Sequence, residues 1–194
     1  MTVRADLKNG EPAVLLGDAF FFGTLAAVRD LGRTGAAVSV AETHFGASHS
    51  GSSRYCLQRL KAPSLHDTSY LEWLLAQGEN TPGAFLHATS DDMVWLMAVH
   101  EEVLRQRFTL FQAPREAVFA LLDKCQLYAH ARRLGIAIPQ THAPTHPDEV
   151  RALGQALQRE GGFPVIVKPR TQACMSAKQK GSVVRSPEEL SNAV

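Results

Sequence analysis

The feature that most constrains the fold is an alternation of apolar, strand-like runs with helical segments. The run AVLLG (13–17) is continuously apolar and ends in glycine, as interior strands of a parallel sheet do. The segment after it, FGTLAAVRDLGRTG (22–35), has helical periodicity and contains Gly32 and Gly35, which we expect to end the helix. Alternation at this spacing predicts a doubly wound parallel sheet with right-handed crossovers.

The same alternation continues as far as residue 115. Further strand-like segments are found at 36–42, 52–63, 84–90 and 109–114, and helical segments at 66–80 and 91–108. We therefore predict an α/β fold in which residues 1–115 form a doubly wound, Rossmann-like domain.

The regular alternation of strands and helices ends at residue 115. The sequence predicts a long helix at 115–134, a second helix at 147–162, strands at 164–168 and 181–186 separated by a polar loop, and a final helix. In that final helix Ser186 is the expected N-cap, Pro187 lies in the first turn, and Glu189 is the reciprocal acid of a capping box. The chain ends about two turns into this helix. We therefore predict that residues 116–194 form a small, incomplete α+β domain.

Composition and charge exclude several classes of function. The net charge of +1 predicts no binding to nucleic acid or to anionic membranes. The apolar segment 13–28 is interrupted by Asp18 and is too short to span a bilayer, so we interpret it as a buried strand and a helix. The three cysteines are widely spaced and form no C-x-x-C pair, which favours a reducing, cytoplasmic environment.

Two lysines are candidate anion ligands. In GGFPVIVKPR (161–170), Lys168 ends an apolar run that is typical of an interior strand, so its ammonium group either reaches water or meets an anion. Lys124 lies within a helical pattern and is either solvated or functional. Lysine serves as a flexible point charge for polyphosphates, but neither lysine by itself establishes an anion site.

Other candidates lie in the first domain. The segment TSDD (89–92) is at a strand-to-helix junction, where parallel sheets bind ligands, although it also suits an N-cap with acids near the helix dipole. We predict Ser90, Asp91 and the close-approach residue Gly17 as substrate-binding residues. The stretch around Gly17 contains neither a dinucleotide-binding fingerprint nor a P-loop.

The aromatic and histidine residues are less informative. Three consecutive phenylalanines (20–22) are expected to pack in a core or an interface. His142 and His146 are spaced like helical metal ligands, but the prolines beside them exclude a regular helix. His44 and His49 flank a Gly/Ser-rich loop that either covers a substrate or lies on the surface.

The order of motifs in the second half resembles the N-terminal portion of the ATP-grasp superfamily. The matching pieces are Asp123-Lys124, Leu134-Gly135-Ile136 with Pro139 and Thr141, Phe163-Pro164, and Val167-Lys168-Pro169. In the first half, SSRYC (52–56) and HATSDDMVWLMA (87–98) are similar to a carboxylate–amine ligase branch.

The resemblance implies a domain assignment and an ATP site. Residues 1–115 would be the pre-ATP-grasp domain, and 116–194 the linker helix with a truncated first ATP-grasp subdomain. Lys124 and Lys168 match the positions that contact ATP phosphates, and Arg170 is a second candidate cation there. The loop that follows is often glycine-rich in the family, whereas here it reads TQACMSAKQKG. Ser176 and Lys178, with Lys180, are therefore expected to contribute donors in place of backbone amides.

The resemblance also implies an activity. Such a ligase uses ATP and Mg²⁺ to activate a small-molecule carboxylate as an acyl phosphate, which an amine then attacks. The Mg²⁺ ligands of the family lie beyond residue 194, so we expect this chain to be a fragment that is inactive by itself. Two alternatives stay open: a non-catalytic nucleotide- or metabolite-binding module, and an interaction domain that forms a homodimer through its phenylalanine run.

Overall fold

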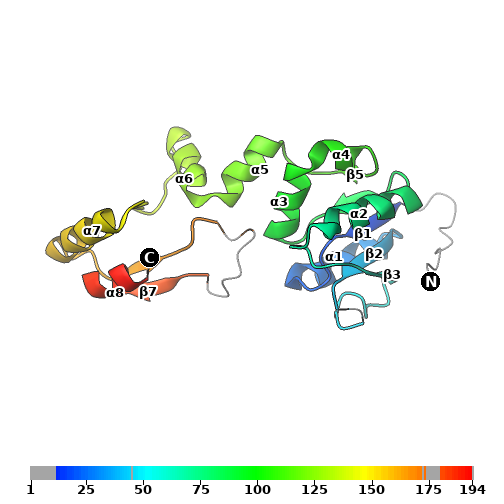
Figure 1. The fold of residues 1–194 in the computed structure, drawn as a ribbon, viewed down its shortest axis with the longest axis horizontal. Helices are drawn as coiled ribbons and strands as arrows, with labels where there is room; N and C mark the ends of the chain where they lie inside the picture. The colour runs from blue at the N-terminus through cyan, green and yellow to red at the C-terminus, as the bar shows by residue number, and fades with distance from the viewer. Residues whose placement is uncertain (1–11, 45, 172, 174–179, 194) are drawn as a thin grey trace. The chain divides into compact units, whose positions relative to one another are not determined.

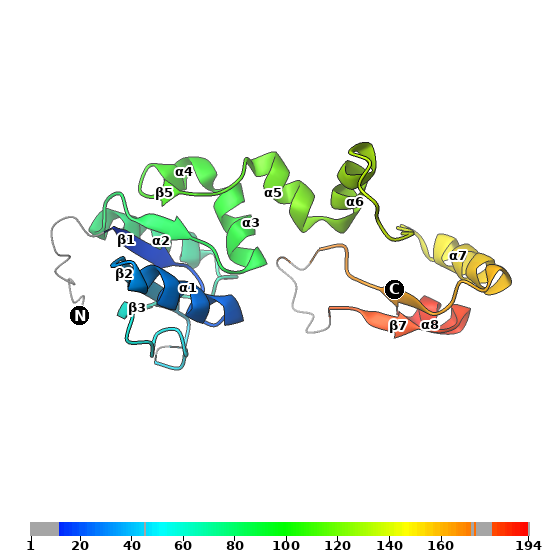
Figure 2. The same cartoon turned by 180° about the vertical axis from the view of Figure 1, so that it is seen from behind.

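The computed structural model describes residues 12–44, 46–171, 173 and 180–193. It divides the chain into two compact units, Met1–Phe119 and Ala120–Val194, each of which is described by itself. Figures 1 and 2 show the elements of the chain from two opposite sides.

Unit 1 is built on a five-stranded parallel sheet in the order β3-β2-β1-β4-β5. Its strands are β1 (Ala13–Leu16), β2 (Ala37–Glu42), β3 (Cys56–Lys61), β4 (Phe85–His87) and β5 (Thr109–Leu110). The chain moves outward from β1 to β3 and then returns to the other side of β1. The sheet is therefore doubly wound, and the predicted fold class is confirmed.

Helices cover both faces of this sheet. They are α1 (Phe22–Arg33), α2 (Ser69–Asn80), α3 (Asp91–Val99) and α4 (Glu101–Arg105). Alternate side chains of β1 point to opposite faces, so Val14 and Leu16 pack with Val28 of α1, whereas Leu15 packs with residues of α2, α3 and α4 such as Leu74. Figures 1 and 2 show α1 and α2 on opposite sides of the strands. This two-sided burial explains why β1 is continuously apolar.

Two predicted long helices are interrupted. The segment 91–108 forms α3 and α4, which are separated at His100, and the segment 115–134 forms α5 (Arg115–Leu122) and α6 (Lys124–Arg133). Asp123 adopts an extended backbone conformation (φ −101°, ψ 110°) between the latter two. Hydrophobic periodicity runs through both junctions, so the pattern alone could not locate either break.

Gly32 does not end α1. The helix continues to Arg33, and Gly35 follows with a positive φ of 90°. A Cβ atom at Gly32 would lie 2.6 Å from Cβ of Tyr55. Glycine is therefore required at this position for the close approach of Tyr55 to the helix.

Unit 2 contains a small antiparallel hairpin with helices packed against one face. After α6 come α7 (Pro147–Glu160), β6 (Val165–Val167), β7 (Ser182–Val184) and α8 (Pro187–Asn192). Residues 137–145 form a connector without regular structure. The core of the unit consists of Val150, Val184 and Leu190, with Val165 and Val167 packed against them. The helix α7 begins at Pro147, has acids in its first turn and is followed by Gly161 in the left-handed conformation.

Within the described residues, β6 is not the interior strand that its apolar run predicted. In the described part of the chain it pairs only with β7, and Ile166 is 61% exposed on the face away from the core. Ile166 lies opposite Val183, which is 49% exposed. The apolar run therefore provides one buried face and one outward-facing apolar pair.

The N-cap of α8 is confirmed, but its capping box is shifted. The hydroxyl of Ser186 accepts from the amide of Glu189 (3.2 Å). The Glu189 carboxylate accepts from the amide of Arg185 (2.8 Å), one residue earlier than a capping box requires. Among the described helices of both units, none is long and apolar enough to cross a membrane.

Candidate functional site

The first candidate site begins with Asp123, the N-cap of α6. Its Oδ1 accepts from the backbone amides of Cys125 (2.9 Å) and Gln126 (3.3 Å), which have no partner within the helix. This capping allows the helix to start at Lys124 rather than to continue from α5. The Asp-Lys pair of the sequence is therefore a helix cap followed by the first helical residue.

Arg170, which lies three residues beyond β6, is bound to this cap. Its Nε and Nη2 both donate to one oxygen of Asp123, Oδ2, at 2.7 and 2.6 Å, and this ion pair joins residues 47 positions apart. The amide of Lys124 donates to the carbonyl oxygen of Arg170 (3.0 Å), and the Nζ atom of Lys124 lies 3.5 Å from the same oxygen. Both the backbone and the side chains therefore attach the segment after β6 to the start of α6.

The ion pair changes the pKa of Asp123. The hydrogen bond from Arg170 lowers the pKa of Asp123 to about 2, and the backbone amides of Gln126 and Cys125 act in the same direction. Asp123 therefore remains ionised at any physiological pH.

Lys168 lies between β6 and this ion pair, and its side chain is exposed. A Cβ atom built on Gly181 would lie 3.0 Å from Cγ of Lys168 and 3.6 Å from Cγ2 of Ile166, so both side chains lie beside Gly181. Ile166 is paired with Val183 on the outward face of the hairpin. An exposed apolar pair thus adjoins a cation, an arrangement that suits a ligand with a flat apolar part and an anionic part.

The structure gathers three of the five predicted ATP-binding residues at the end of β6. Lys124 and Arg170 are joined directly, and Lys168 is two residues before Arg170. The guanidinium group of Arg170 is already paired with Asp123, a residue whose role sequence analysis did not specify. Ser176 and Lys178 lie outside the described residues.

The predicted substrate residues lie at the carboxyl ends of β1 and β4, where the winding of the sheet reverses. The Ser90 hydroxyl accepts from the amide of Met93 (3.4 Å) as the N-cap of α3, and Asp91 is exposed in the first turn. Gly17 is buried, and a Cβ atom there would lie 2.5 Å from Sδ of Met93. Its carbonyl oxygen accepts from the Tyr70 hydroxyl. Gly17 and Ser90 therefore have structural partners, and of the three predicted residues only Asp91 has its side chain in solvent.

Sequence analysis missed a buried acid at the end of β2. Glu42 is fully buried, and its carboxylate accepts from the amide of Gly46 (2.6 Å) and from the hydroxyl of Ser48. Nε of Arg59 lies 4.0 Å from the carboxylate and donates to the carbonyl of Gly51 (2.7 Å). This network holds the Gly/Ser-rich loop between β2 and β3. An acid directly after an apolar run, followed by that loop, was the signal available in the sequence.

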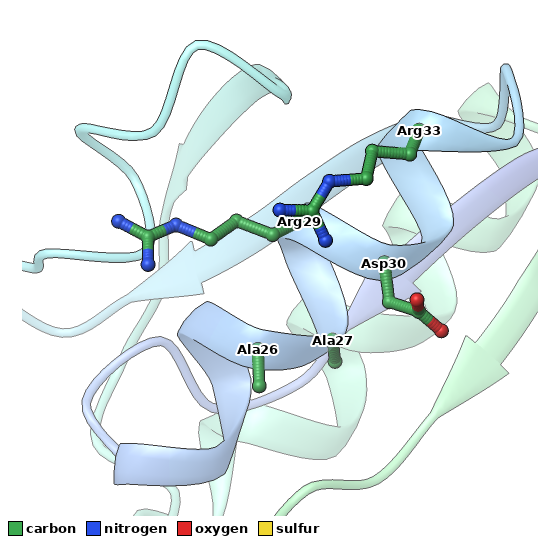
Figure 3. Close-up of a pocket in the computed structure, with 5 residues that line it drawn as sticks. All are labelled: Ala26, Ala27, Arg29, Asp30 and Arg33. Carbon is green, nitrogen blue, oxygen red and sulfur yellow. The ribbon is translucent and has the colours of Figure 1, made fainter.

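A shallow depression of about 520 Å³ lies on the outer side of α1. It is lined by Ala26, Ala27, Arg29, Asp30 and Arg33 (Figure 3). None of the predicted ATP or substrate residues lines it. Within the ranges that the structure describes, no three His, Cys, Asp or Glu side chains form a group that could hold a metal ion.

Comparison with known proteins gives matches in structure only. No protein-family profile matches the sequence, and no curated protein matches it. An L-amino acid ligase from Bacillus licheniformis matches with a TM-score of 0.69 and 15% identity, over 97% of this chain and 42% of that one. The ADP complex of N5-carboxyaminoimidazole ribonucleotide synthetase matches with a TM-score of 0.68 and 13% identity, over 94% of this chain and 44% of that one. A third match is the biotin carboxylase domain of the Hydrogenobacter thermophilus 2-oxoglutarate carboxylase, in complex with MgADP, ADP and bicarbonate. Its TM-score is 0.66 and its identity 13%, over 93% of this chain and 39% of that one.

These matches define the class of fold. The three structures are those of ATP-grasp enzymes, and this chain has the fold of their N-terminal portion. The chain spans 39–44% of their length. The resemblance seen in the order of sequence motifs is thereby confirmed at the level of the fold.

Proposed function

We propose that this chain is the part of an ATP-dependent carboxylate–amine ligase that provides one side of the ATP site and part of the substrate pocket. The observation that carries the proposal is the connection between α6 and the end of β6. Asp123 and Arg170 bring Lys124 next to the segment that contains Lys168, although the two lysines are 44 positions apart in sequence. A cation beside an apolar surface, with a second cation on the adjoining segment, would suit a nucleoside polyphosphate.

Side chains of unit 2 would suit ATP in charge and in polarity. Lys124 and Lys168 would bind the phosphates, while the exposed pair Ile166 and Val183 offers a flat apolar surface for the base. Arg170 would act mainly through Asp123, because its guanidinium is engaged in the ion pair. We propose no Mg²⁺ ligands among the described residues.

ATP would supply the phosphoryl group that converts a carboxylate into an acyl phosphate, from which an amine displaces phosphate. The residues of this chain would contribute position and charge. The two ammonium groups would offset the negative charge on the phosphate oxygens as it shifts in the transition state. Removal of one such cation should raise the barrier by about 2–4 kcal/mol, by analogy with the loss of a preorganised donor.

Trapping of the acyl phosphate tests this reaction class. The protein that contains this chain is incubated with Mg·ATP, hydroxylamine and a panel of small carboxylates, and both ADP and hydroxamate are measured. We expect the two products to form together and only with particular carboxylates. Lys124→Ala should lower kcat/KM for ATP by about 30-fold or more, whereas Lys61→Ala, an exposed lysine of unit 1, should not. Binding of ATP without carboxylate-dependent ADP release would favour the non-catalytic binding module instead.

A further inference from the structure

A second cationic site lies in unit 1, around the ring of Tyr55. The guanidinium carbon of Arg54 is 4.8 Å from the centroid of this ring and that of Arg33 is 5.8 Å from it. Nη2 of Arg54 also donates to the Tyr55 hydroxyl oxygen (2.8 Å). Two guanidinium groups, from α1 and from the residue before Tyr55, therefore meet at one aromatic side chain.

A glycine and small side chains of α1 shape the surface around these groups. Gly32 allows Tyr55 to lie against the last turn of α1. Arg29 precedes Arg33 by one helical turn, and Figure 3 shows both side chains extending to the same side of α1, while Asp30 extends to the other. The two arginines border the depression on α1 together with the small side chains of the helix. The result is a shallow recess with cations along one side.

Asp30 also lines the depression, but its side chain extends away from the two arginines of α1 (Figure 3). Among the residues that the structure describes, no carboxylate lies within ion-pair distance of Arg29, Arg33 or Arg54. A favourable interaction with the helix dipole explains the position of Arg33 in the last turn of α1, but not the positions of Arg29 and Arg54. Arg54, with a smaller effect of Arg33, lowers the pKa of the Tyr55 phenol, which is consistent with a positive potential at its oxygen.

We propose that Arg29, Arg33, Arg54 and Tyr55 form a binding site for a small molecule that carries a phosphate group. Guanidinium groups present paired N–H donors that match the oxygens of a phosphate, and the phenol supplies one more donor. The alanines in the recess would contact an apolar part of the ligand. Tyr55 precedes β3, at the edge of the sheet opposite the carboxyl ends where Gly17 and Ser90 lie. All four residues belong to unit 1, so the site shares no residue with the proposed ATP site of unit 2.

Titration with inorganic phosphate tests this site. The Nε–H resonances of the arginines are followed by NMR at low, constant ionic strength, with chloride as the reference anion. We expect saturable shifts at Arg33 and Arg54, and a rise in the pKa of Tyr55 when phosphate draws the guanidinium groups from the phenol. Arg33→Gln combined with Arg54→Gln should weaken phosphate binding at Arg29 by about tenfold or more.

Two control variants make the result specific. Arg159→Gln removes a matched arginine from the last turn of α7 and should leave the shifts at Arg33 and Arg54 unchanged. Lys168→Ala should also leave them unchanged, so failure of the ATP proposal would not affect this test. Shifts that do not saturate, or that chloride reproduces, would overturn the proposal. So would saturable shifts caused by a hexaglutamate peptide but not by phosphate.

Discussion

Single residues in this chain often have a role that differs from the one their chemistry suggests. Arg170 looks like a phosphate ligand in the sequence, yet two nitrogens of its guanidinium donate to one oxygen of Asp123. Gly17 looks like a residue that admits a ligand, yet it admits the side chain of Met93. In each case the partner is distant in sequence, so local pattern could not identify it.

The depressed pKa of Asp123 gives a prediction in acid. Because the pKa is about 2 in the folded protein and near 3.8 without its partners, the ionised group stabilises the fold above pH 4. This contribution should be lost as the pH falls from about 4 to 2. The pKa can be measured by carboxyl ¹³C NMR.

The variant Arg170→Gln should raise the pKa of Asp123 toward its usual value. Asp67 is a matched control, because its own lowered pKa arises from hydrogen bonds with Ser69. Its pKa should be the same in both proteins. An unchanged pKa of Asp123 in the variant would show that Arg170 is not its partner in solution.

At the level of elements, the loop between β2 and β3 is organised by one buried carboxylate. Glu42 receives donors from Gly46 and Ser48, and a Cβ atom at Gly51 would lie 2.2 Å from its Oε1. A residue larger than glycine at position 51 would therefore displace the carboxylate. The loop is folded against the sheet by polar contacts rather than by an apolar core.

Replacement of this carboxylate should loosen the loop. Glu42→Gln turns one acceptor into a donor that faces other donors, so we expect a loss of about 2 kcal/mol in the free energy of unfolding. The amide of Gly46 should also lose protection from hydrogen exchange. Glu72→Gln, at an exposed position in α2, should change stability by less than about 0.5 kcal/mol. Equal stability and protection in the Glu42 and Glu72 variants would contradict this account of the loop.

Elements were predictable wherever the pattern of burial was simple. The strands β1 and β2 were found because they are buried on both faces. Hydrophobic periodicity did not locate the break between α5 and α6, because Asp123 ends one periodic segment by capping the next. The single exposed face of β6 was also missed, since an apolar residue such as Ile166 gives the same signal whether it is buried or open to a ligand.

For the whole molecule, the fold class was predicted from the sequence and is confirmed, and the resemblance is confirmed at the level of the fold. The order of the motifs carried this information, since no single motif is diagnostic. The partners of the candidate site could not be predicted in the same way. The connection between Asp123 and Arg170 spans 47 positions and becomes visible only when β6 and α6 are placed in space.

We propose that Lys168 binds the phosphates of ATP. The most direct measurement is the ratio of the dissociation constants of adenosine and ATP, determined with Mg²⁺ for the wild-type protein and for Lys168→Ala. Because the base is common to both ligands, the change in this ratio isolates the interaction of Lys168 with the phosphates.

We expect the preference for ATP to fall by about 30-fold or more in Lys168→Ala, which corresponds to about 2 kcal/mol. The matched Lys61→Ala variant should retain the full preference. An unchanged ratio in Lys168→Ala would contradict the assignment of the phosphate site to the end of β6.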